Sequence, residues 1–385
     1  MLWINFLHFY QPANKEAFQI REATDKSFLR VLRALEEHPR HKFTLNINAC
    51  MFLRWEEIGY GWIFPRLQKL LASGRLEICG NAAYHPLLPL VPLKEARMQI
   101  SESEAIFKKF LGQDFRAKGF FLSEMAYSAT VAKLVKSLGY EWLILDEIAC
   151  PPKLVQHPSG KCFIDRYSGL EIILRDRRIS NCYAPDVILK LLEEKSGQTL
   201  ITASDGELYG LRHEDPTGEF ERLLKNQNLK TMLVSDYIRE QKTCEKIRIR
   251  PSNWESSEAE LVEGRPYAVW QGKKSGIQKK LWDLAHYSWR TCEKYKKDKN
   301  YAWARWHLVR GLASCTFWWA SEKDFKHNFG PFAWNPDEVE RGLDELVRAV
   351  RSIDSRKSRA EKITAEKAYL DLKKRIWEKH WKKYW

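Results

Sequence analysis

Short apolar runs alternate with amphipathic stretches through the first 205 residues, and this alternation limits the fold more than any other feature of the sequence. Each run has the length of a strand, and the stretches between the runs space their apolar residues at helical intervals. Strands that alternate with helices predict a parallel sheet with right-handed crossovers. We therefore expect an α/β fold with strands at 2–7, 43–47, 76–79, 119–122, 142–145, 171–174 and 200–203.

A single acid, Glu124, follows the apolar strand at 119–122, and a helix is expected from 130 to 138. In α/β folds, ligands bind and catalysis occurs at the carboxyl ends of the strands. The dipole of the following helix would also favour an acid at this place. A carboxylate that ends a wholly apolar strand is costly unless it is used, so we interpret Glu124 as catalytic.

A second acid, Asp205, occupies the equivalent place after the strand at 200–203. Asp205-Gly206 is also a common turn pair, so either acid alone is weak evidence. Two carboxyl groups that face each other across the mouth of a barrel are the minimum for glycoside cleavage. One protonates the leaving oxygen and the other attacks the carbon.

Polar side chains also follow two other strands. His8, Tyr10 and Gln11 lie where the first strand ends, before Pro12. His85 lies in the loop 80–92, where three prolines favour an extended, rigid backbone. A histidine beside a strand is usually a satisfied polar residue, but this grouping favours a binding role.

Taken together, five stretches resemble glycoside hydrolase family 57, the family of α-amylases, amylopullulanases and 4-α-glucanotransferases. In order they are His8-Phe-Tyr-Gln-Pro12, Gly80 to Pro89, Gly119 to Ser128, Asp205-Gly-Glu207 and Thr316-Phe-Trp-Trp-Ala-Ser321. Tyr10 stands where the family pattern has a second His. The resemblance spans roughly residues 1 to 325, and five motifs in order with both acids are a specific signal.

The resemblance implies a retaining enzyme that acts on α-1,4-linked glucans, as a hydrolase or a transglycosylase, without a metal or cofactor. Glu124 would be its nucleophile and Asp205 its general acid/base. The residues implied to bind substrate are His8, Tyr10, Gln11, His85, Glu207, Trp254, Trp270, Trp318 and Trp319. For each of the four Trp residues, packing in the core is an equally good interpretation.

The family's fold is an irregular seven-stranded (β/α) barrel followed by a helical region that completes the site. The sequence agrees, because strand patterns fade after about residue 250 and long amphipathic helices are expected at 277–294 and 301–317. We expect a barrel domain at 1–265 and a helical region at 266–385. The region ends in a basic helix at 356–385, with Ile363, Leu370 and Trp377 packed inward.

The net charge of +14 raises nucleic acid as a partner, but the last 31 residues alone carry eleven Lys or Arg against four acids. Half of the excess positive charge thus lies in the tail, and we do not expect a nucleic-acid partner. We also expect no membrane span. The eight cysteines form no Cys-x-x-Cys pair, which favours reduced thiols in a cytoplasmic protein.

Three other classes stay open. A metal-dependent polysaccharide deacetylase on a related barrel needs closely spaced His ligands, and His38 and His41 are the only close pair. A protein that binds α-glucans without turnover would explain why Tyr10 replaces the second His of the family pattern. It would not explain why both acids are retained. A nucleic-acid binder rests on charge and on the 16 Trp residues alone. The motifs do not separate hydrolysis from transglycosylation or branching, and they leave the oligomeric state unknown.

Overall fold

The computed structural model describes residues 1–151, 160–194, 197–323 and 333–384. The chain forms two compact units. The first comprises Met1–Ala83 and Pro92–Trp254, and the second comprises Tyr84–Val91 and Glu255–Trp385. Within the described residues, no helix is both long and apolar enough to cross a membrane.

The first unit contains a sheet built on the N-terminal strand β1. Its strand order is β3-β2-β1-β8, every neighbouring pair is parallel, and the short strand β9 also pairs with β1. The parallel sheet predicted from the alternation of strands and helices is confirmed. The strands are β1 (Leu2–Phe9), β2 (Phe43–Ile47), β3 (Leu76–Ile78), β8 (Thr199–Asp205) and β9 (Lys230–Thr231).

A second sheet in the same unit has the order β10-β6-β7-β5-β4. Its neighbouring strands are parallel except for the pair β6 and β7, so β10 and β6 run in the opposite direction to β7, β5 and β4. The strands are β4 (Gly119–Phe120), β5 (Trp142–Asp146), β6 (Cys162–Asp165), β7 (Glu171–Arg175) and β10 (Glu245–Ile247).

The predicted closed barrel of seven strands is not confirmed, because the described residues form two separate ladders. An isolated parallel bridge between Gly80 and Phe120 links the end of β3 to β4. At the other side, the Asp176 N–H donates to the Ile201 carbonyl at 2.8 Å. Strand β6 already pairs with Glu171–Ile173 of β7 and so occupies the edge that β8 would need for a continuous ladder.

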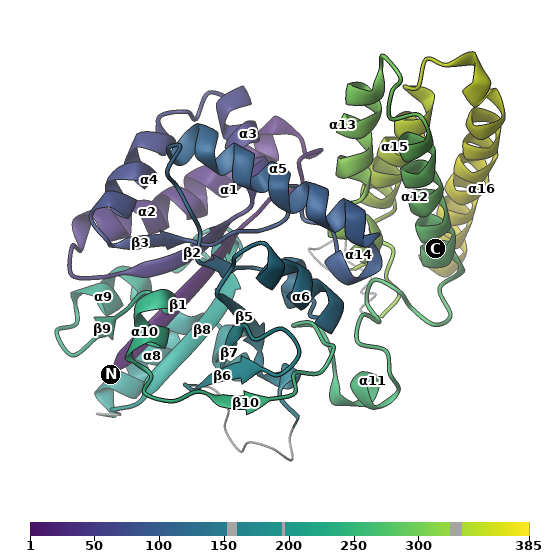
Figure 1. The fold of residues 1–385 in the computed structure, drawn as a ribbon. Helices are drawn as coiled ribbons and strands as arrows, with labels where there is room; N and C mark the ends of the chain where they lie inside the picture. The colour runs from purple at the N-terminus through teal and green to yellow at the C-terminus, as the bar shows by residue number, and fades with distance from the viewer. Residues whose placement is uncertain (152–159, 195–196, 324–332, 385) are drawn as a thin grey trace. The chain divides into compact units, whose positions relative to one another are not determined.

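The helices of the first unit follow the predicted alternation and surround its strands (Figure 1). The helix α6 illustrates the local causes. The Ser128 hydroxyl caps its first turn, Val131, Leu134 and Val135 are buried, and Gly139 follows the last turn at φ 94°. The longer helices of this unit are α2 (Leu29–Glu37), α3 (Ala49–Glu57), α4 (Ile63–Ala72), α5 (Leu93–Leu111), α6 (Ala129–Ser137) and α8 (Ala184–Glu193).

The second unit is helical, as expected for this part of the chain. Helices α12, α13, α15 and α16 pack against one another (Figure 1). The helix predicted at 301–317 is divided, because the Ser314 N–H donates to the His85 carbonyl at 2.9 Å and Ala313 bridges Pro86. The helices are α11 (Glu258–Val262), α12 (Gly276–Lys294), α13 (Tyr301–Gly311), α14 (Ser314–Trp318), α15 (Pro336–Arg351) and α16 (Arg359–Tyr384).

Two expectations need correction. On α16, Ile363 and Leu370 are exposed and Trp377 is partly buried, whereas Ala365, Leu372 and Ile376 are fully buried, so the buried row lies beside the predicted one. The thiols are not all free either, because Cys162 and Cys244 form a disulfide. They are 82 residues apart in sequence, but β6 and β10 are neighbours and bring their Cα atoms to 5.1 Å.

Candidate active site

His8 lies at the end of β1, between Asn46 of β2 and Asp205 of β8 in the sheet register. Its Nδ1 lies 2.7 Å from the Asn46 amide oxygen. A carbonyl oxygen only accepts, so Nδ1 carries the proton and Nε2 is the unprotonated nitrogen. Burial lowers the pKa of His8 to about 4, although the Asp205 carboxylate acts to raise it. The ring is therefore neutral at pH 7.

Tyr10 and Gln11 follow directly. The Tyr10 ring stacks on His8 with centroids 5.7 Å apart, and Gln11 donates its side-chain amide to Glu207. The Gln11 backbone N–H also donates to the sulfur of Met51 at 3.2 Å. The first motif therefore fixes three polar side chains at one end of the parallel sheet, as the sequence predicted from their place after the strand.

Asp205 is the last residue of β8, and Glu207 follows in the next turn. Arg212 bridges the two acids, with Nη1 3.0 Å from Asp205 Oδ2 and Nε on Glu207. The Arg212 backbone N–H also donates to the Glu207 carbonyl at 2.8 Å, so the loop folds back on itself. Asp205 is 30% exposed at its side chain, whereas Glu207 is buried.

Burial raises the pKa of the Glu207 carboxyl to about 7, although the Arg212 cation acts to lower it. The Asp205 charge also raises this pKa. Glu207 thus changes charge near neutral pH while its two oxygens are held by Gln11 and Arg212. A buried acid with a perturbed pKa in a loop at strand ends is typical of a functional site.

Glu124 lies in a strained turn after β4. Its backbone has φ 61° and ψ 19°, and the next residue, Met125, has φ 51°. Side chains other than glycine rarely adopt this left-handed conformation, and such strain clusters at active sites. The turn directs the Glu124 carboxylate to the indole of Trp254, whose N–H donates to Oε2 at 2.9 Å.

A series of aromatic contacts connects the surroundings of Glu124 with those of Asp205. Phe121 stacks on His8 at 4.7 Å, and Trp254 meets both rings edge-on or tilted at about 6 Å. His8 thus contacts the Glu124 side of the site through Phe121 and Trp254, and it is the cross-strand partner of Asp205. The structure brings His8, Tyr10, Gln11, Glu124, Asp205, Glu207 and Trp254 into one connected cluster within the first unit.

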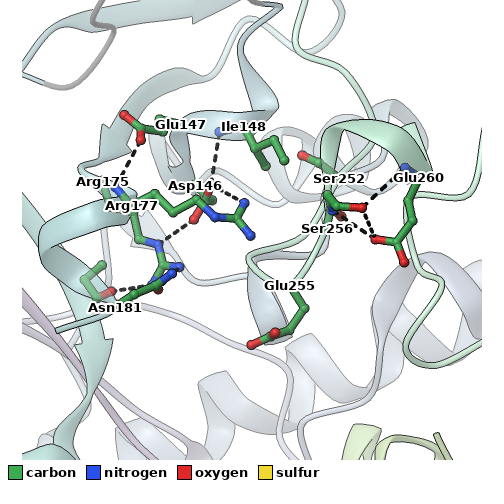
Figure 2. A network of polar contacts seen from close by, with 12 residues as sticks. Asp146, Glu147, Ile148, Arg175, Arg177, Asn181, Ser252, Glu255, Ser256 and Glu260 are labelled. Carbon is green, nitrogen blue, oxygen red and sulfur yellow. Dashed lines mark hydrogen bonds and ion pairs between the residues drawn. The ribbon is translucent and has the colours of Figure 1, made fainter. Parts of the chain in front are cut away.

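A buried ion pair lies beside this cluster, and the sequence did not single it out as part of the site. Figure 2 shows Asp146 between Arg175 and Arg177, at 2.7 and 3.1 Å. Arg175 also donates to the Ala203 carbonyl at 2.7 Å, two residues before Asp205, and its guanidinium lies 5.3 Å from the centre of the Trp254 ring. The sequence did carry a signal for this ion pair, because Asp146 and Arg175 also lie at the ends of strands.

The remaining predicted residues belong to the second unit. His85 has φ 56° and its Nδ1 lies 2.9 Å from the Ser314 hydroxyl, so the second motif contacts the segment that leads into the fifth. Trp270 is fully buried, and its carbonyl accepts a hydrogen bond from Trp282, which is the packing role weighed against sugar stacking above. Trp318 and Trp319 are partly exposed and meet edge to face at 4.6 Å.

The first unit's cluster contains the groups that acid–base and nucleophilic chemistry require. Glu124 is a carboxylate fixed by a strained turn and one N–H donor. Asp205 is a partly exposed acid held by a cation, and His8 is a neutral imidazole beside it. Among the described residues, no three His, Cys, Asp or Glu side chains gather so as to hold a metal ion.

The profile of glycosyl hydrolase family 57 matches residues 4–250. An alpha-amylase of Pyrococcus horikoshii is 27% identical over 147 residues, which are 37% of this chain and 23% of that protein. A 4-alpha-glucanotransferase of Thermococcus litoralis is 29% identical over 147 residues, which are 37% of this chain and 22% of that protein. The chain thus matches less than a quarter of the length of these two curated relatives.

Solved structures share the fold over a larger part of the chain. A GH57-type branching enzyme from Pyrococcus horikoshii superimposes with a TM-score of 0.71 at 14% identity, over 96% of this chain and 95% of that one. The crystal structure of the 4-alpha-glucanotransferase from Thermococcus litoralis gives a TM-score of 0.70 at 16% identity, over 92% of this chain and 60% of that one. At these identities the likeness concerns the fold.

Proposed function

The chain belongs to glycosyl hydrolase family 57, and on that basis we propose that it cleaves α-1,4-linked glucans by a retaining double displacement. Glu124 is the nucleophile and Asp205 the general acid/base. The observation that carries the proposal is the left-handed turn at Glu124, which fixes its carboxylate on the Trp254 N–H within the same cluster as Asp205. The acceptor is water or the hydroxyl group of another sugar.

The reaction has two steps. In the first, a Glu124 oxygen attacks the anomeric carbon while Asp205 gives its proton to the leaving oxygen, so that the glycosidic bond breaks and a glycosyl ester forms. In the second, the Asp205 carboxylate removes a proton from water or a sugar hydroxyl, whose oxygen attacks the same carbon. The ester bond breaks and Glu124 regains its carboxylate.

Neighbouring residues position these two acids. Trp254 donates to Glu124, and its ring contacts both the His8 ring and the Arg175 guanidinium. Arg212 fixes Asp205 relative to Glu207, and Gln11 holds the other side of Glu207. His8 and Tyr10 provide a neutral, stacked pair of rings suited to sugar hydroxyl groups. In the second unit we assign His85, Trp318 and Trp319 to substrate binding as the family resemblance implies.

We also infer that seven of the strands correspond to the irregular barrel expected for the family. The order β1-β2-β3-β4-β5-β7-β8 is supported by the two ladders, by the bridge from Gly80 to Phe120 and by the bond from Asp176 to Ile201. The antiparallel β6 accounts for the irregularity. The domain boundary at 265 and the helical region from 266 to 385 remain part of this proposal.

Azide rescue tests the two roles separately. Glu124→Gly suits the left-handed backbone and leaves space for azide, which should attack an activated aryl α-glucoside directly and give the β-glycosyl azide. In Asp205→Ala the glycosyl ester still forms, and azide should release it as the α-glycosyl azide. Identical azide anomers from both variants, or full activity in either one without azide, would refute the assignment.

A further inference from the structure

Two tryptophans on α13 expose large parts of their side chains. Trp303 is 62% exposed and Trp306 is 42% exposed. They are three residues apart on one helix, so they lie on the same face, and their ring centres are 6.1 Å apart. Neither residue belongs to the motifs that define the proposed active site, so this exposed pair is a candidate for a further binding surface.

Arg310 fixes the orientation of the Trp306 ring. Its guanidinium carbon lies 3.5 Å from the centre of the indole and 5.4 Å from the centre of the Tyr84 ring. Arg310 is itself buried and donates to the Trp306 carbonyl at 2.9 Å. The His307 ring meets Trp306 at right angles at 4.8 Å and pairs with Glu345. One face of the indole is therefore covered by the cation, and the ring loses little freedom when a ligand stacks on the other side.

This pair of indoles begins beside a predicted substrate-binding residue. Tyr84 directly precedes His85, and both belong to the second unit together with α13. Tyr84, Arg310, Trp306 and Trp303 therefore form a continuous series that leads away from His85 along α13. We call the two exposed residues, Trp303 and Trp306, the α13 aromatic pair.

We propose that the α13 aromatic pair binds the sugar rings of a long α-glucan chain, so that the protein favours polymeric over short substrates. This inference rests on the proposed function. Flat apolar rings suit the apolar faces of pyranose units, as they suit other flat ligands, and Arg310 fixes the orientation of one of the two, Trp306.

The size of the pair argues against a protein partner. A tryptophan side chain buries about 150–250 Å² when it is fully covered. Even both indoles together fall short of the roughly 800 Å² per partner that a stable protein interface needs. Among the residues of this unit that the structure describes, the other exposed large apolar side chains lie on α11 and α16, so they do not extend the patch on α13.

The test compares Trp306→Ala, Trp303→Ala and Trp306→Phe with Trp381→Ala. Trp381 is a matched control, because it is 52% exposed in the same unit and also has a second indole, that of Trp377, at 6.1 Å, but it lies on α16 and not beside Arg310. Each substitution is made in the full chain with Glu124→Gln, which prevents turnover, and affinity for maltotriose, maltoheptaose and glycogen is measured by calorimetry and affinity gels. Each Ala variant on α13 should bind glycogen about 10-fold more weakly, with a smaller loss as the ligand shortens. Trp306→Phe should recover part of the loss, and Trp381→Ala should match the parent.

Several outcomes would overturn the inference. Unchanged glycogen affinity, or an equal loss for maltotriose and glycogen, would remove the aromatic pair from chain binding. A change in oligomeric state by light scattering, with glucan affinity unchanged, would show a contact between copies. If Trp306→Ala unfolds, Trp303→Ala still decides, because its side chain is mostly exposed. If the native protein turns over α-glucans but the α13 variants keep full glycogen affinity, this inference is refuted and the proposed function is not. A native protein that neither binds nor cleaves α-glucans refutes the proposed function as well.

Discussion

Replacing Glu207 with glutamine should change how stability depends on pH. The pKa of the Glu207 carboxyl is raised by burial from its ordinary value of 4.5 to about 7. Between these two values the folded protein holds a proton that the unfolded chain has released. Stability therefore falls as the pH rises from 4.5 to 7 and then levels off.

The magnitude follows from the two pKa values. One pKa unit corresponds to about 1.4 kcal/mol, so ionising Glu207 in the fold costs about 3 kcal/mol above pH 7. Glutamine keeps the shape but cannot ionise. Its amide oxygen can still accept from Arg212, and its NH2 group then faces Gln11, whose side-chain amide must turn to present its oxygen. The free energy of unfolding of Glu207→Gln, relative to the native protein, should therefore rise by about 3 kcal/mol between pH 4 and pH 8.

Urea unfolding followed by circular dichroism at a series of pH values measures this difference. The comparison between variant and native protein is essential, because His8 acts in the opposite direction in the same range. Burial lowers the pKa of His8 to about 4, so its contribution is present above pH 6.5 and is lost as the pH falls toward 4. Subtracting the two curves removes that contribution.

Glu221 provides a control of opposite sign. Burial acts to raise its pKa, but the hydrogen bonds from Arg30 lower it below the ordinary value. Its contribution is present above pH 4.5 and is lost on acidification, so Glu221→Gln should lose stability relative to the native protein as the pH rises through the acidic range. The argument about Glu207 would be refuted if the difference in unfolding free energy between Glu207→Gln and the native protein did not change with pH, while Glu221→Gln showed the expected slope.

Three further predictions concern the reaction. Glu124→Gln should abolish turnover and leave the melting temperature nearly unchanged, since the amide can still accept the Trp254 hydrogen bond but cannot attack carbon; measurable native-like turnover in folded protein contradicts this. Asp205→Asn should slow maltooligosaccharides far more than activated aryl glycosides, whose leaving groups need little acid help, and equal slowing would count against the acid role. Trp254→Phe should lower kcat about 10- to 100-fold by removing a hydrogen bond to a charged group, and steady-state kinetics that show only a higher KM would assign Trp254 to binding instead.

Strand ends were the most informative feature of the sequence. His8 and Asp205 could be placed because each follows an apolar run, and parallel strands that alternate with helices bring such ends to one edge of a sheet. The register confirms that these two residues are cross-strand partners. Asp146 and Arg175 carried the same signal, but an acid and a cation on neighbouring strands satisfy each other, and the sequence alone does not separate a supporting ion pair from a reacting group.

Other features depend on contacts between distant segments, which periodicity does not report. Arg212 could not be selected because it lies in a loop among other charged residues, and only the turn geometry brings it to Asp205 and Glu207. The pairing of Cys162 with Cys244 follows from β6 and β10 becoming neighbours. All seven predicted strands are present, but the sequence did not predict β6, β9 and β10. Strand β6 also interrupts the ladder between β7 and β8, so the predicted closure is not seen in the described residues.

The turn at Glu124 is the clearest case in which local conformation and function point the same way. Two consecutive left-handed residues cost roughly 1–3 kcal/mol each. The segment 252–254 offsets part of this, because Tyr127 N–H donates to the Ser252 carbonyl at 2.8 Å and Trp254 N–H donates to the Glu124 carbonyl at 3.2 Å. Glycine would adopt φ 61° freely and asparagine would adopt it more readily than glutamate, so backbone stability alone favours neither this residue nor this strain. Two backbone hydrogen bonds hold this turn, and one indole N–H holds its carboxylate, an arrangement best explained by a requirement for the carboxylate itself.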